Sequence, residues 1–158
     1  MYLIVKTIHV LSVVLFLGNI ITGLFWKAHA DGTRDPRMQA HALAGVIRSD
    51  AWFTIPSVLV IIASGVALAS MAGLPLLGTG WIAVSLAAFG LSGVLFAAIL
   101  APLQRRLLNE ALAAQGGAEW PSAAYRRMSL IWEVVGLIAI ALPLAALALM
   151  VFKPAILF

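Results

Sequence analysis

Four long apolar runs, separated by shorter polar stretches, dominate the sequence. They cover roughly residues 2–26, 47–71, 80–101 and 127–152. Each run approaches or exceeds the roughly 20 residues that a helix needs to cross about 30 Å of hydrocarbon. The first run is longer than the apolar part of a cleaved signal peptide, and we expect it to be a retained helix. The pattern therefore predicts an all-α fold, a four-transmembrane-helix antiparallel bundle.

Polar flanking sequence indicates that two of these helices continue beyond the apolar runs. Asp35 followed by Pro36 is typical of an N-cap with proline at the first helical position, so the second helix is expected to begin there. Leucines recur at helical spacing beyond residue 101 until Gly116 and Gly117, which are expected to end the third helix. The chain is thus predicted to form a single integral membrane domain over residues 1–158. Helices 2 and 3 extend into the cytoplasm, and the four helices cover about 2–26, 36–71, 80–115 and 121–152.

Basic residues are distributed unequally along the chain and orient the predicted bundle. Eight of the 10 Lys and Arg residues lie in or beside the first and third loops. The second loop has none, and the two ends contribute Lys6 and Lys153. Since cytoplasmic loops are enriched in Lys and Arg, both basic loops are predicted to be cytoplasmic. The protein is then integral to the cytoplasmic (inner) membrane, with its N- and C-termini periplasmic or extracellular.

Composition supports the membrane class and excludes several kinds of chemistry. Hydrophobic residues make up 63% and charged residues 10% of the 158 residues, and the mean hydropathy is +1.08. Soluble domains are about half apolar and about a quarter charged. The absence of cysteine excludes disulfides, zinc–thiolate sites, iron–sulfur clusters and thiol nucleophiles. The net charge of +4 resides in residues that flank the apolar runs, so the expected partner is membrane lipid and not nucleic acid.

One face of the first helix carries polar residues that hydrocarbon disfavours. Alternating spacings of three and four residues relate His9, Ser12, Phe16, Asn19 and Gly23. This spacing places them on one stripe that faces the interior of a bundle. His9, Ser12 and Asn19 are therefore candidate cofactor-binding residues, with His9 as the candidate ligand of a metal or haem iron. The alternative is that the stripe only joins helices through hydrogen bonds.

Glu133 is interpreted as the one acidic residue that lies well inside an apolar run, near the inner leaflet. An isolated carboxylate there would cost several kcal/mol, so it is expected to be paired or protonated. The expected partners are Arg48, at the start of the second helix, and Arg127, on the same helix as Glu133. We therefore predict a structural ion pair between helices at this depth, with a proton relay as the alternative.

Short sequence motifs open and close the four runs. They are Val5 to Val10, Arg48 to Pro56, Gly80-Trp81, Arg126 to Glu133, and Phe152 to Pro154. In these motifs, and over nearly its full length, the chain resembles a bacterial family of small four-helix integral membrane proteins that carries a domain-of-unknown-function label. It is also distantly similar to HemJ-type protoporphyrinogen oxidases and to the CopD copper-resistance membrane domain.

The similarity to HemJ-type enzymes implies that haem b is bound through the histidine of the first helix, which is His9 here. In those enzymes a lysine early in the third helix is implicated in activity, and this chain has Ser85 at that position. The neighbouring histidine of those enzymes is replaced by Ala83. These departures argue against protoporphyrinogen oxidation, and no catalytic residue is predicted.

Two functions follow from these observations. The first is an integral membrane protein that binds haem b through His9 for electron transfer, sensing or haem handling. The alternative is a non-enzymatic membrane subunit or small transporter whose polar stripe is purely structural. Copper permeation, as in the CopD relatives, is disfavoured because the sequence has neither cysteine nor a cluster of Met and His. Small residues on the third helix, at Gly93, Ala97 and Ala101, favour a homo-oligomer.

Overall fold

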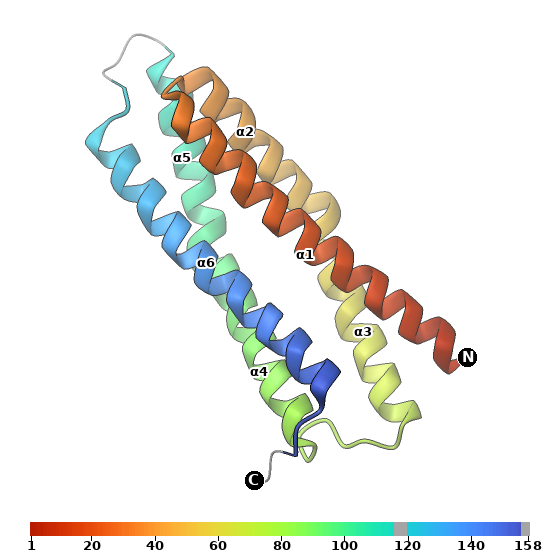
Figure 1. The fold of residues 1–158 in the computed structure, drawn as a ribbon. Coiled ribbons are helices and arrows are strands. Elements are labelled where there is room, and N and C mark those ends of the chain that lie inside the picture. Colours follow the sequence, from red (N-terminus) through yellow and green to blue (C-terminus); the bar gives the residue numbers. More distant parts are fainter. Residues whose placement is uncertain (116–119, 156–158) are drawn as a thin grey trace.

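The computed structural model describes residues 1–115 and 120–155, and every regular element within them is helical. Figure 1 shows these elements as long rods that run back and forth along one axis, with both termini toward the same end. The segments η1 and η2 are π-helical, and the other elements are α-helices. In chain order they are α1 (Tyr2–Thr33), α2 (Pro36–Ser49), η1 (Asp50–Thr54), α3 (Ile55–Met71), α4 (Gly80–Leu95), η2 (Phe96–Leu100), α5 (Ala101–Ala114) and α6 (Ala123–Phe152).

Within the described residues, four helical stretches are long and apolar enough to cross a membrane, judged by length and composition. Two of them are the single helices α1 and α6. The other two are continuous through a π-helical segment, over Pro36–Met71 and Gly80–Ala114. The prediction of an all-helical protein with four such stretches is thereby confirmed. The expected helix stop at Gly116 and Gly117 lies outside the described residues.

The first helix continues well beyond the predicted end at residue 26. It closes at Arg34, which adopts a left-handed conformation with a φ of 53° and donates its backbone N–H to the carbonyl of Asp31. Lys27, which the predicted helix end at residue 26 would leave in the first loop, therefore belongs to α1. The predicted N-cap of the next helix is confirmed, because the Asp35 carboxylate accepts the backbone N–H of Arg37 at 2.8 Å.

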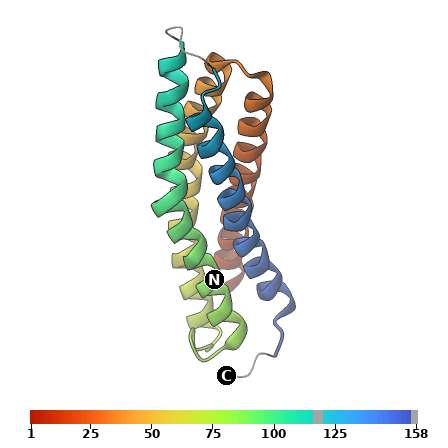
Figure 2. The ribbon, with the colours of Figure 1, turned by 90° about the vertical axis from the view of Figure 1, so that its left-hand side faces the viewer.

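The helices pair in a pattern that divides the bundle into two halves. α1 packs along α3, α4 packs along α6, and α2 packs along α5. Within the described residues, α3 makes no close approach to α4 or α6. The two helix pairs α1–α3 and α4–α6 are therefore joined through α2 and α5 at one end, and they lie further apart toward the end with the termini (Figures 1 and 2).

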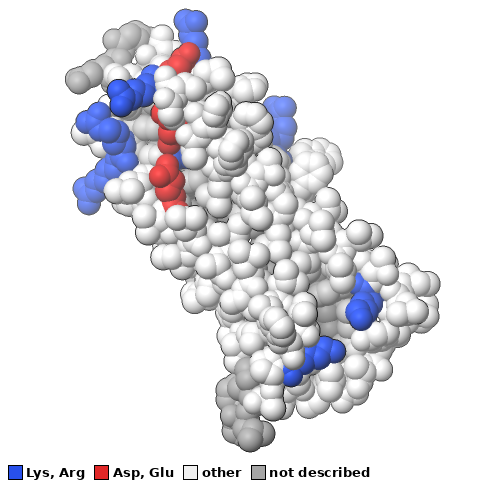
Figure 3. Space-filling view, viewed as in Figure 1, with Lys and Arg blue, Asp and Glu red and all other residues white. Residues whose placement is uncertain are grey.

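Charged and apolar side chains occupy different parts of the surface. Figure 3 shows Asp and Glu, with many Lys and Arg side chains, at the end where α2 and α5 pack, and other Lys or Arg side chains toward the end with the termini. A band of other residues covers the visible middle of the molecule. More than half of the surface of Val14, Leu59, Val94 and Leu137 is exposed. Because a helix with apolar side chains on all sides is typical of a membrane span, hydrocarbon is the natural surrounding of these outer faces.

Both π-helical segments end two residues before a proline. η1 precedes Pro56, and η2 precedes Pro102. Proline lacks an N–H group, and its ring clashes with the carbonyl four residues earlier, so the preceding turn cannot keep regular α-helical bonding. One widened turn of π-helix accommodates the clash within an otherwise continuous helix. The two prolines thus explain where the irregular turns lie.

A third proline, Pro143, lies inside α6 and is accommodated in another way. It leaves the carbonyl of Ala139 without its usual intrahelical donor. The hydroxyl of Ser92 on α4 donates to this carbonyl at 2.6 Å. Side chains of neighbouring helices often satisfy freed carbonyls in membrane proteins. The proline and the serine together therefore join α4 to α6.

Candidate functional site

A cavity of about 90 Å³ lies between the two helix pairs. One buried water molecule needs roughly 10–15 Å³ of such volume, so the cavity has room for several. Residues of α1, α4 and α6 line it, and so do residues of both π-helical segments. Its walls are mostly apolar, and its polar side chains are Asn19, Asp50, Thr54, Ser92 and Gln104.

Asp50 is the ionisable residue of this cavity, and it is buried at 7% exposure. Three neutral groups donate to its carboxylate: the Asn19 amide at 3.2 Å, the Thr54 hydroxyl at 2.9 Å and the Gln104 amide at 3.1 Å. The Asn19 amide also donates to the Thr54 hydroxyl at 2.9 Å. We call Asp50, Asn19, Thr54 and Gln104 the Asp50 site. It connects α1, η1 and α5, and thus the two halves of the bundle.

No cation of the described part of the chain balances the charge of Asp50. The ion pairs there involve Lys27, Asp31 and Glu133 alone. An ionised carboxylate buried without a cation is costly, even when neutral donors surround it. Such a group takes up either a proton or a cation from outside the chain. The Asp50 site therefore has the chemistry of a site for a positive charge.

Aromatic side chains form much of the remaining wall of the cavity. Phe16 of α1 and Phe89 of α4 meet across the two helix pairs, with ring centroids 5.5 Å apart. Phe96 and Trp132 also line the cavity. Trp132 is only 4% exposed, and its Nε1–H group has no acceptor among the described residues. A buried donor without a partner is rare in proteins and marks a place where a ligand or an ordered water is accommodated.

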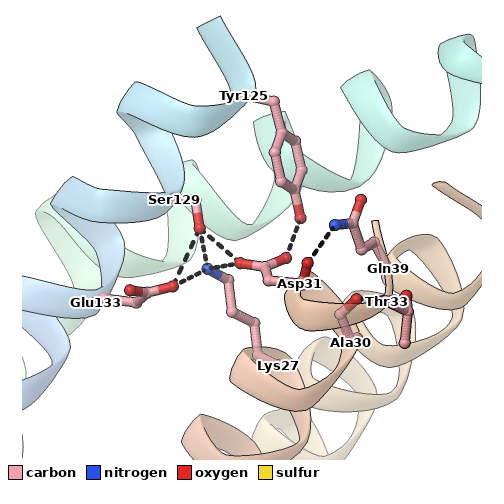
Figure 4. Close-up of polar contacts among 8 residues, drawn as sticks. All are labelled: Lys27, Ala30, Asp31, Thr33, Gln39, Tyr125, Ser129 and Glu133. Atoms are coloured by element: carbon pink, nitrogen blue, oxygen red, sulfur yellow. Dashed lines mark hydrogen bonds and ion pairs between the residues drawn. The ribbon is translucent and has the colours of Figure 1, made fainter. Parts of the chain in front are cut away.

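A second buried polar group lies beside the connection between α1 and α2, and Figure 4 shows its side chains. Lys27 is 1% exposed, and its Nζ lies 2.6 Å from Oδ2 of Asp31 and 2.8 Å from Oε1 of Glu133. Ser129 accepts a hydrogen bond from Lys27 and donates to Asp31 at 2.7 Å. The Tyr125 hydroxyl donates to the other carboxylate oxygen of Asp31 at 2.7 Å. We call these residues the Lys27 cluster: Lys27, Asp31, Tyr125, Ser129 and Glu133.

The Lys27 cluster joins α1 to α6 through one buried cation that two carboxylates share. The ring of Trp132 adds a cation–π contact, with its centroid 5.2 Å from Nζ. Trp132 therefore touches both the Lys27 cluster and the cavity. The carboxylates of this cluster, unlike Asp50, therefore already have a cation of the protein beside them.

The structure pairs Glu133 with Lys27, and not with Arg48 or Arg127. Both arginines are exposed, and neither forms an ion pair within the part of the chain that the structure describes. Glu133 was predicted to pair with a cation of another helix, and that cation is Lys27, a residue expected in a loop. The continuation of α1 beyond residue 26 is the physical reason, because it carries Lys27 to the side of α6.

The three candidate cofactor-binding residues of α1 have separate partners. Nδ1 of His9 lies 2.9 Å from the Ser64 hydroxyl of α3, and the ring packs on Gly65, where an added Cβ would lie 3.3 Å from Cε1. Ser12 is buried and donates to a carbonyl of its own helix. Asn19 belongs to the Asp50 site. Of the three, Asn19 lines the cavity, and His9 and Ser12 do not.

His9 keeps one ring nitrogen that is suited to ligate a metal. Because the Ser64 hydroxyl donates to the backbone carbonyl of Val60, its contact with His9 fits the tautomer in which Nδ1–H donates a hydrogen bond to the Ser64 oxygen. In that tautomer Nε2 carries the lone pair, and an imidazole fixed in this way is typical of ligating histidines. This donor chemistry fits one axial haem ligand. His9 does not belong to a site with several protein ligands, because residues 1–115 and 120–155 contain no group of three His, Cys, Asp or Glu side chains placed to hold a metal ion.

Sequence reasoning missed the centre of the cavity. The interpretation of Glu133 as the one acidic residue well inside an apolar run overlooks Asp50, which lies within the run at residues 47–71. That position was the available signal, because a carboxylate in such a run needs an explanation as much as Glu133 does. Gln104 and Trp132 carry no comparable signal, since glutamine is ordinary in a polar helix extension and tryptophan is ordinary in a membrane helix.

The comparisons with known proteins concern almost the whole chain. A family model described as "Predicted integral membrane protein (DUF2269)" matches residues 3–154, a range that takes in all four helical stretches nearly completely. No curated protein and no solved structure matches the chain. These findings support a membrane family with a domain-of-unknown-function label, and they add no support for the distant similarity to HemJ-type enzymes or CopD.

Proposed function

The chain belongs to the DUF2269 family of predicted integral membrane proteins, and on this premise we propose that it is a small transporter that binds its solute in the central cavity. The observation that carries the proposal is the buried Asp50 carboxylate, which has three neutral donors and no cation among the described residues. Ionisable residues inside a membrane bundle typically mark substrate or ion pathways. The Asp50 site is thus the proposed binding centre.

Two further features of the cavity favour binding over simple packing. Both π-helical segments contribute to its walls, and such segments occur frequently at functional sites. Trp132, on the same walls, has an N–H group without an acceptor in the described chain. A purely structural polar stripe favours close packing with every buried donor satisfied. The cavity and the Trp132 donor therefore both suit a bound molecule, either a ligand or an ordered water.

We infer that a route into the cavity runs from the end with the termini, where Phe16 and Phe89 would have to separate. At the opposite end, α2 packs along α5, and the Lys27 cluster joins α1 to α6. Toward the termini, α3 approaches neither α4 nor α6 within the described residues. Helix groups that rock against each other around a central site are a common basis of transport. The Lys27 cluster would then hold the closed end together.

We also propose that the charged end faces the cytoplasm and that both termini face the periplasm or the exterior. The support is the gathering of charge at one end, where eight of the 10 basic residues lie in or beside two loops (Figure 3). A cysteine at Leu77, in the exposed connection between α3 and α4, should react with an impermeant reagent in intact cells. A cysteine at the exposed Gly32 of α1 should react only after lysis, and the reverse pattern would contradict this orientation.

The test of transport uses the absence of cysteine, which permits labelling without background. Gly93 lines the cavity and has open space beside it, since an added Cβ would meet no atom within 4 Å. We expect Gly93→Cys in membrane vesicles to react with a water-soluble methanethiosulfonate. Val94→Cys, at the next position and 61% exposed on α4, is the matched control and should stay unreactive in lipid. A Gly93→Cys protein as unreactive as its control would indicate a dry, structural interior and overturn the proposal.

A second candidate function is haem b binding at His9, favoured by the lone pair that the Ser64 contact leaves on Nε2. Haem would supply one-electron chemistry, and His9 would hold its iron as one axial ligand. The test is the absorption spectrum of the protein purified after expression with ample haem. A Soret band that disappears in the His9→Ala variant would support this function, and a spectrum without that band in the unchanged protein would contradict it. The result is independent of the cavity, which His9 does not line.

A further inference from the structure

We infer that the solute of the central cavity is a small organic cation, with its ammonium group beside Asp50 and its apolar body against the aromatic wall. This inference rests on the proposed function, because it names the solute class for the same cavity. It follows from the charge of the Asp50 site, from the nature of the wall and from the direction in which the amide side chains of the site point.

The charge of the site selects a cation over an anion or a neutral molecule. The Asp50 carboxylate lies on the cavity, and no positive group of the described chain neutralises it. A bound cation would supply the missing charge, whereas an anion would add a second negative charge in a region of low dielectric. The nearby Lys27 does not compete for this role, because Asp31 and Glu133 already hold its ammonium group.

The walls of the cavity select an organic body over a hydrated ion. They are mostly apolar, and four of the lining side chains are aromatic: Phe16, Phe89, Phe96 and Trp132. Aromatic faces attract alkylammonium groups through cation–π contacts, and they also bury alkyl surface favourably. The volume of about 90 Å³ limits the ligand to a compact molecule. For a primary or secondary amine, Asp50 would also accept an N–H bond.

The direction of the amides disfavours a bare metal ion. Asn19 and Gln104 both point their NH₂ groups at Asp50, so their nitrogen atoms, and not their oxygen atoms, approach the carboxylate. A metal ion needs several oxygen ligands around it, and here one carboxylate and one hydroxyl stand beside donors of hydrogen bonds. The described residues also lack any group of three acidic or histidine ligands. The Asp50 site therefore suits a single, weakly hydrated positive charge better than a metal ion.

The experiment measures charge selectivity at the Gly93→Cys position in reconstituted vesicles. The probes are two methanethiosulfonates, a cationic one with a trimethylammonium-ethyl group and an anionic one with a sulfonatoethyl group. The rate at which each modifies the cysteine is divided by the rate at which it reacts with free 2-mercaptoethanol. We expect the cationic reagent to modify the cysteine at least about tenfold faster, because Asp50 attracts one reagent and repels the other. Addition of Asp50→Asn to the same protein should bring the two normalised rates close together.

A second measurement keeps Asp50 in place and so does not depend on the folding of that variant. Tetramethylammonium chloride should slow the cationic modification of Gly93→Cys in a saturable manner, and potassium chloride at the same concentration should not. Equal slowing by both salts would point to an inorganic cation and overturn the inference. Equal normalised rates for the two reagents would also overturn it, while the cavity itself would remain accessible. The absence of any reaction would instead overturn the proposed transport function.

Discussion

The Lys27 cluster and the Asp50 site both place carboxylates between helices, buried at Asp50 and partly exposed at Asp31 and Glu133, yet they differ in a second respect. In the Lys27 cluster, the ammonium group lies within 2.8 Å of two carboxylates, and a serine and a tyrosine complete the hydrogen bonds. In the Asp50 site, three neutral groups surround a carboxylate that has no cation in the described chain. The first contains its own cation, and the second does not.

This difference separates a structural connection from a binding site more clearly than burial does. Lys27 is 1% exposed and Asp50 is 7% exposed, so burial alone would rank the lysine first. A carboxylate that already has a cation within the protein has less need of a charged ligand. A carboxylate without one, beside a cavity, favours a molecule that brings a positive charge.

The largest effect is expected when the Lys27 cluster loses its cation. Lys27→Met would leave Asp31 and Glu133 side by side without a positive charge, and should lower the free energy of unfolding by about 3 kcal/mol, the low end for a buried pair, because both carboxylates are partly exposed. Thermal denaturation of the protein in detergent measures this loss. Lys6→Met, at an exposed position, is the matched control and should change stability by less than about 0.5 kcal/mol. Equal stability of the two variants would refute the structural role of the cluster.

An intermediate effect is expected at the neutral connection between α4 and α6. Ser92→Ala would leave the Ala139 carbonyl, already freed by Pro143, without a donor, at a cost of about 1–3 kcal/mol. Ser70→Ala, at an exposed serine of α3, serves as the control in the same denaturation assay. In a Pro143→Ala background the intrahelical bond returns, and the effect of Ser92→Ala should shrink. An unchanged effect in that background would show that the serine acts in another way.

The smallest effect on stability is expected at the Asp50 site. Asp50→Asn removes an unbalanced charge and keeps one oxygen acceptor for Thr54 or the amides, so stability should change by no more than about 1 kcal/mol, in either direction. The same denaturation assay measures this change. A loss as large as that of Lys27→Met would mean that Asp50 is a structural residue, and the contrast between the two regions would fail.

The main features of the fold could be predicted from the sequence because they depend on local patterns. Four apolar runs indicated four helical stretches, and Asp35 with Pro36 marked a helix start that the structure confirms. The end of α1 was harder, because no proline lies between residues 26 and 33, and the one glycine there, Gly32, is accommodated inside the helix. The π-helical turns before Pro56 and Pro102 were not predicted. A proline in a membrane helix is compatible with a kink, with a π-bulge, or with a regular helix in which a neighbouring side chain donates to the freed carbonyl.

The site could be predicted only in part because it depends on contacts between distant segments. Asn19 was singled out by its place on a helix face, and it does belong to the Asp50 site. Its partners Asp50 and Gln104 come from other helices, and no spacing along the chain relates them to Asn19. Glu133 was expected to need a cation, but the choice among basic residues depends on how far α1 extends, which fixes the position of Lys27.

Each π-helical turn also determines which side of its helix faces the bundle. A π turn adds one residue to the α-helical repeat, and one residue corresponds to a rotation of about 100° about the helix axis. The rotational setting of α3 relative to α2 thus depends on the residue count of Asp50–Thr54. Deletion of one residue there would remove the added residue from the repeat and turn the buried Ser57, Ile61 and Ser64 away from the interior. The exposed side of α3 is also apolar, so the sequence of α3 itself would oppose that rotation only weakly. The five residues of η1, at the proposed binding site, therefore determine which side of α3 faces the interior.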